Sequence, residues 1–230
     1  MGKGILSTDL KQLANILYKE KICSDISPFQ KIIGEVKKGG YDLQKLKLKI
    51  DSVPNNIRPS VTSLEILLNV QITETLLNEN NIDNPVSIYN FSIEIMGKNE
   101  GQTVHSSWHL DFDNTLDNKY THPSFHLTYG GKTMKSTELG NVLLLPAPRI
   151  SYPPMDAVLG VDFVLSNFVK KETYNKIKTN SQYKAAVKRS QQRLWRPYML
   201  SIANHWCRFS GCNFMTDSTL SKKYHPTLID

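Results

Sequence analysis

Apolar residues at the start of the chain recur at the spacing of an α-helix. Over residues 7–22 they return every three or four positions behind Ser7 and Thr8, which predicts a capped amphipathic helix. A second helix is expected over residues 28–38, ended by two glycines. The aliphatic stripe over residues 61–77 predicts a third helix. The first 85 residues are therefore expected to be mostly helical.

The pattern then changes to a period of two residues, which is typical of strands. Apolar and polar residues alternate over 89–95 and 104–112, with a glycine-flanked turn over 97–101. An antiparallel hairpin with one apolar face is therefore expected. Residues 125–129 predict a third strand, and residues 142–145 a short, buried fourth.

The remainder of the chain predicts a stiff segment followed by helices. Residues 146–154 (PAPRISYPP) contain four prolines and are expected to run extended. Helices are expected over 155–168 and 182–206, the second bent or interrupted near Pro197. The predicted fold class is α+β: an antiparallel sheet of about four strands, with N-terminal and C-terminal helices packed on one face.

A length of 230 residues suits a single domain. Its parts are a helical N-terminal part (1–85), the antiparallel sheet (86–150) and a basic helical C-terminal part (151–230). Neither a signal-peptide pattern nor an apolar run of membrane-spanning length is found, so a cytoplasmic location without a membrane partner is expected. Three cysteines, an odd number, favour reduced thiols over a disulfide framework.

The formal net charge is +7, and much of the positive excess lies toward the C-terminus. Between residues 170 and 208 the only acidic residue is Glu172. Basic residues at helical spacing form a stripe on the last predicted long helix: Lys184, Lys188, Arg189, Arg193 and Arg196. This basic stripe favours contact with nucleic acid or an acidic protein subunit, whereas the alternative is a charged helix face that is only solvated.

The polar positions of the predicted hairpin hold histidine and aspartate. His109 and Asp111 alternate along one strand, about 7 Å apart at their Cα atoms, and His126 lies on the same face of the next strand. This set suits a divalent metal (Mn, Mg, Fe or Zn), and it can equally supply general acid and base groups for phosphodiester cleavage. The alternative is the ordinary wet face of an antiparallel sheet.

Three more residues complete the predicted catalytic set. His105 and Asp113 share the polar alternation and are candidates for the general base. Arg149 lies in the proline-rich segment, where a guanidinium is held rigidly enough to bind a phosphate through two parallel hydrogen bonds. The alternative for Arg149 is an internal pair with Asp156 or Asp162.

Three segments in the second half of the chain carry a resemblance: THPSFHLTYGG (121–131), LLLPAPRISYPPMDAVLGVDFVLSNF (143–168) and LWRPY (194–198). In amino-acid sequence and in their order along the chain, they resemble a bacterial protein family associated with mobile and defence islands. The resemblance implies a bacterial cytosolic protein that acts with other protein subunits. It supplies no activity and no catalytic residues.

Three functions follow from these features. The favoured one is an accessory or effector subunit of a bacterial nucleic-acid-linked system, an anti-phage defence system, whose basic C-terminal helices contact nucleic acid or a partner. The second is a metal-dependent phosphodiesterase or nuclease that uses the His/Asp face of the sheet. The third is a non-catalytic protein adaptor.

Overall fold

A meander of antiparallel strands forms the centre of the protein. The structure, a computed structural model, describes residues 3–51, 53–74, 84–113, 123–130, 150–206 and 218–228. The sheet has six strands in the order β1-β2-β3-β4-β5-β6, so each strand pairs with its neighbour in sequence. Their bounds are β1 Gly40–Ile50, β2 Leu64–Glu74, β3 Val86–Asn99, β4 Gln102–Phe112, β5 Phe125–Tyr129 and β6 Ile150–Ser151.

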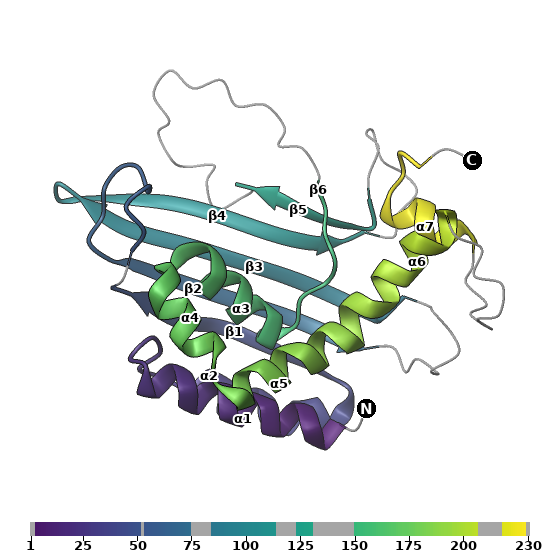
Figure 1. Ribbon diagram of the computed structural model, residues 1–230, viewed down its shortest axis with the longest axis horizontal. Helices are drawn as coiled ribbons and strands as arrows, with labels where there is room; N and C mark the ends of the chain where they lie inside the picture. Colours follow the sequence, from purple (N-terminus) through teal and green to yellow (C-terminus); the bar gives the residue numbers. More distant parts are fainter. Residues whose placement is uncertain are drawn as a thin grey trace.

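The helices cover one face of this sheet (Figure 1). Their bounds are α1 Lys3–Lys19, α2 Ser27–Glu35, η1 Val36–Lys38, α3 Ala157–Phe168, α4 Lys171–Lys178, α5 Ser181–Ser190, η3 Gln191–Trp195, α6 Arg196–Trp206 and α7 Ser218–Tyr224. α1 packs against α2, α3 and α5, α2 packs on β1, and α3 packs on β2. The α+β class with helices on one face is therefore confirmed, with six strands instead of about four.

The third predicted helix, over residues 61–77, is wrong, because β2 occupies most of that range. β2 buries every second residue: Leu64, Ile66, Leu68, Val70 and Ile72. A run this rich in aliphatic residues satisfies helical and strand spacing at once, and its β-branched residues pack well in a sheet. The N-terminal part, 1–85, is therefore only partly helical.

The sequence pattern did not predict β1, because a bulge interrupts the alternation of its apolar and polar residues. The pairing register with β2 shifts between Leu43 and Leu46. Lys45, inside the bulge, has a φ of 53°, and its backbone N–H donates to Asn69 Oδ1 at 2.7 Å. A bulge adds one residue to one strand, so the period of two breaks there.

The predicted hairpin is confirmed as β3 and β4, and the third predicted strand is confirmed as β5. Glu100 and Gly101 make the hairpin turn with positive φ angles of 49° and 81°. The strand predicted over residues 142–145 lies outside the described residues.

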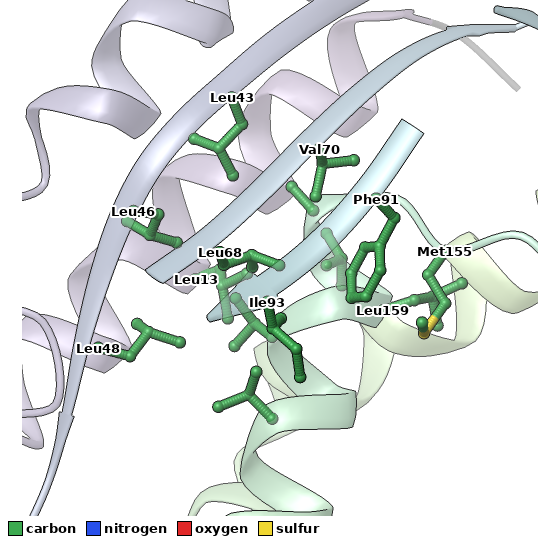
Figure 2. Close-up of a cluster of buried hydrophobic side chains, with 14 of the residues drawn as sticks. Leu13, Leu43, Leu46, Leu48, Leu68, Val70, Phe91, Ile93, Met155 and Leu159 are labelled. Carbon is green, nitrogen blue, oxygen red and sulfur yellow. The ribbon is translucent and has the colours of Figure 1, made fainter. Parts of the chain in front are cut away.

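The core lies between the apolar face of the sheet and the helices. Figure 2 shows the side chains of β1, β2 and β3 meeting those of α1 and α3, including Leu68, Phe91 and Leu159. Gly160 allows α3 to lie close to the sheet, because a Cβ there would stand 2.8 Å from Phe91 Cε2. The tight packing of this interface fixes the sheet, and with it the side chains on its opposite, polar face.

The C-terminal helices agree with the sequence in outline. α3 begins at the N-cap Asp156, whose carboxylate accepts from the N–H of Leu159 at 2.9 Å. The predicted helix over 182–206 is α5 and α6, joined by the π-helical segment η3, which ends two residues before Pro197. The short helices α4 and α7 were not predicted. Among the described residues, no helix combines the length and apolar character needed to cross a membrane.

Candidate acid-base site

The carboxylate of Asp111 lies between two imidazoles on the polar face of the sheet. Asp111 Oδ2 is 3.2 Å from His109 Nε2 and 3.9 Å from His126 Nε2. The side chains of Asp111 and His109 are 41% and 24% exposed, whereas that of His126 is 5% exposed. The cluster therefore has two members that solvent reaches and one that the fold encloses.

The strand register brings the three residues together. Asp111 of β4 pairs directly with His126 of β5, and His109 pairs with Thr128. Directly opposed residues of an antiparallel pair point to the same face, as do residues two apart along one strand. The sequence prediction that His109, Asp111 and His126 share one face is confirmed by this register.

The ring of His126 is held in one orientation. Its Nδ1 lies 3.1 Å from the carbonyl oxygen of Pro123, which can only accept a hydrogen bond. Nδ1 therefore carries a proton, and Nε2 is the atom that faces Asp111. A histidine anchored by one ring nitrogen to a backbone carbonyl presents the other for proton exchange or for metal binding.

A buried hydroxyl lies beside the cluster. Thr128 Oγ1 is inaccessible to solvent and has no hydrogen-bond partner within the described part of the chain. Leaving such a group unpaired costs about 1–3 kcal/mol of stability. Thr128 pairs directly with His109, so its side chain lies on the same face as the cluster.

The metal role of these residues stays a prediction. Over the described ranges, no group of three or more His, Cys, Asp or Glu side chains is arranged to hold a metal ion. His109, Asp111 and His126 meet as ion-pair partners through a single carboxylate oxygen. The anchored ring of His126 and the half-exposed carboxylate of Asp111 are the two groups best placed to ligate an ion there.

The remaining predicted catalytic residues are dispersed. His105 is exposed and opposite Met96, four residues before His109 on β4, so their Cα atoms are about 14 Å apart. Asp113 follows β4 directly, and its backbone N–H donates to the carbonyl of Ser124 at 2.8 Å. Asp113 thus stays close to Asp111, while His105 does not reach the cluster. Arg149 lies outside the described residues.

Two members of the basic stripe hold the fold together. Arg189 Nε donates to Asp9 Oδ2 at 2.9 Å, which ties α5 to α1. Arg193 Nε donates to Glu74 Oε1 at 2.8 Å, and its Nη2 pairs with the buried Asp156. These guanidinium groups are engaged with internal carboxylates, so they are poorly placed to bind a phosphate backbone.

The other three members of the basic stripe, Lys184, Lys188 and Arg196, are exposed. They lie on helices that cover the apolar face of the sheet, whereas the His/Asp cluster lies on the polar face. The basic stripe and the cluster therefore belong to different sides of the molecule (Figure 1). A ligand bound along the helices would not reach Asp111 directly.

No family model matches this chain, and neither a curated protein nor a solved structure matches it. The resemblance of residues 121–131, 143–168 and 194–198 to a bacterial family consequently stays a prediction.

Proposed function

We propose that the protein hydrolyses a phosphodiester by general acid-base catalysis at His109 and Asp111, within a nucleic-acid-linked bacterial system. The observation that carries the proposal is the position of the Asp111 carboxylate, 3.2 Å from His109 Nε2 and 3.9 Å from His126 Nε2. A carboxylate beside an imidazole fixes the tautomer of the ring and stabilises its protonated form.

Each residue has a distinct role in the proposed reaction. With Nε2 of His109 directed at Asp111, the Nδ1 atom of His109 is the one that exchanges protons. It takes a proton from water as the water oxygen bonds to phosphorus, and it returns that proton to the oxygen that leaves as the P–O bond breaks. Asp111 stabilises the imidazolium that forms between these two steps.

His126 is a positioning residue in this scheme. Its side chain is enclosed and its ring is anchored to the carbonyl of Pro123, so it faces Asp111 from within the fold. An enclosed ring in this position limits how the neighbouring Asp111 carboxylate can turn. An anionic substrate suits the chain, whose net charge is +7.

The experiment measures cleavage of end-labelled single-stranded RNA, single-stranded DNA and duplex DNA, and of a cyclic dinucleotide, by the purified protein. Each substrate is assayed with EDTA and with added Mn²⁺, which separates a metal-free reaction from a metal-dependent one. The variant His109→Ala should lose at least about a hundredfold in rate, the low end of what a general acid-base residue contributes. The control His205→Ala, on α6, should keep the wild-type rate.

His126→Ala tests the positioning role. We expect a lower rate and an altered pH-rate profile, because Asp111 and His109 are no longer held together. Cleavage by His109→Ala at the wild-type rate would overturn the proposal. If no substrate is cleaved under either condition, the proposal is also rejected, and the non-catalytic adaptor becomes the better account.

A second candidate function is the binding of nucleic acid by the exposed part of the basic stripe. Lys184 and Lys188 lie one turn apart on α5 and are both exposed. The double variant Lys184→Glu/Lys188→Glu should weaken binding to single-stranded DNA and reduce the steepness of the slope of log affinity against log salt by about 1.4. Unchanged affinity and slope would reject this surface as a nucleic-acid contact. Charge reversal at Arg189 or Arg193 is unsuitable for this test, because both hold the fold together.

A further inference from the structure

A concave site lies at the hairpin end of β3 and β4, outside the His/Asp cluster. It is a cleft of about 270 Å³. Most of its lining is apolar: Ile57, Pro59, Val61, Leu64, Ile95 and Val104. Tyr129 and Phe168 contribute aromatic side chains, so the cleft has the apolar walls typical of a small-ligand site.

The fold leaves this part of the apolar sheet face open. β3 and β4 extend to Asn99 and Gln102, whereas α3 ends at Phe168, which forms one wall of the cleft. The segment before β2 forms another wall, through Ile57, Pro59 and Val61. Gly97 lets that segment lie close to the sheet, because a Cβ at Gly97 would stand 2.8 Å from Val61 Cγ1.

The cationic side chain of Arg58 lines this cleft, and it has no acidic partner in the part of the chain that the structure describes. Arg58 is exposed, and its Nη1 donates to the carbonyl oxygens of Asn55 and Ile57 at 2.8 and 2.9 Å. No carboxylate among the described residues forms an ion pair with it. These backbone hydrogen bonds hold the guanidinium in place but leave its positive charge uncompensated, which favours an anionic group on any occupant.

We propose that this cleft binds a small amphipathic carboxylate, with its aliphatic or aromatic body against the apolar lining and its carboxylate on Arg58. Pockets for drug-sized ligands have volumes of roughly 300–1,000 Å³. The volume of this cleft lies just below that range, so the cleft suits a ligand smaller than a drug molecule. The lining residues Ile95 and Val104 face the helices, opposite the side that carries His109 and Asp111. This binding site is therefore separate from the proposed catalytic one, and either can exist without the other.

The experiment measures binding of octanoate to the purified protein by isothermal titration calorimetry, with octan-1-ol as the uncharged counterpart. Octanoate should bind more tightly than octan-1-ol. Arg58→Met should weaken octanoate binding about tenfold or more and leave octan-1-ol unaffected, because it removes only the charge-assisted contact. Lys98→Met removes an exposed cation that does not line the cleft, and it should leave both affinities unchanged.

Ser106→Phe provides a second variant, because Ser106 lines the cleft and a larger side chain there would fill it. Melting temperatures establish that each variant is folded. We expect Ser106→Phe to abolish binding of both molecules. The proposal is overturned if octanoate does not bind the wild-type protein, if Arg58→Met binds it as tightly as the wild type, or if folded Ser106→Phe binds it unchanged.

Discussion

Arg189 and Asp9 form an ion pair between α5 and α1, although 180 residues separate them in sequence. The Asp9 side chain is 1% exposed and that of Arg189 is 28% exposed. The hydrogen bond that Arg189 donates to the Asp9 carboxylate raises the pKa of Arg189, so the guanidinium stays charged. The charge pattern predicted that Arg189 lies on a binding surface. In the structure Arg189 instead joins the N-terminal helix α1 to the C-terminal helix α5.

We expect Arg189→Met to lower the free energy of unfolding by about 2–3 kcal/mol. Removing one partner of a buried pair leaves the other charge uncompensated, and the cost is reduced here because the guanidinium is partly exposed. Lys188→Met removes a charge from the neighbouring exposed position and should change stability by less than about 0.5 kcal/mol. Urea unfolding measures both variants. Equal effects of the two substitutions would contradict a structural role for Arg189.

The close contact between α3 and the sheet gives a prediction with a matched pair of glycines. A Cβ at Gly160 would stand 2.8 Å from Phe91 Cε2 and 3.3 Å from Leu68 Cδ1, whereas a Cβ at Gly34 in α2 meets nothing within 4 Å. Overpacking should make Gly160→Ala less stable by about 1 kcal/mol, even after the gain in helix propensity. Gly34→Ala should be more stable by about 0.5–1 kcal/mol. Thermal unfolding of both variants checks the prediction, and a stabilised Gly160→Ala would contradict the packing described.

Glu74 gives a prediction for the dependence of stability on pH. Burial raises the pKa of Glu74 above its ordinary value of 4.5, because the loss of hydration outweighs the attraction of Arg193. The folded state then holds the Glu74 proton to a higher pH than the unfolded chain does. Glu74 therefore contributes stability that is present below pH 4.5 and is lost as the pH rises through the folded-state pKa.

The comparison variant for this effect is Glu74→Gln, which does not titrate. The free energy of unfolding of the wild type should fall relative to that of Glu74→Gln between about pH 4 and about pH 7. Urea unfolding across this range measures the difference. A difference that stays constant, or that grows in favour of the wild type as the pH rises, would show that the pKa of Glu74 is not raised.

Strand alternation predicted the hairpin and the His/Asp face, because both depend only on which residues share a side of a sheet. The same reasoning failed for β2, where Leu64, Leu67 and Leu68 also fit helical spacing. Sequence also could not predict that Arg193 pairs with Glu74 and Asp156, since those partners become neighbours only when the helices dock on the sheet. Charge pattern alone does not distinguish a binding surface from an internal pair.

The most direct test of the proposed catalytic site compares two carboxylates on the same face of the sheet. Asp111 faces His109 and His126, whereas Glu94 of β3 pairs in register with Ser107, two residues before His109 on β4. The measurement is the single-turnover rate of phosphodiester cleavage by Asp111→Asn and by Glu94→Gln. We predict a loss of about a hundredfold or more for Asp111→Asn and a wild-type rate for Glu94→Gln. Equal rates for the two variants would contradict the assignment of Asp111 and His109 as the catalytic pair.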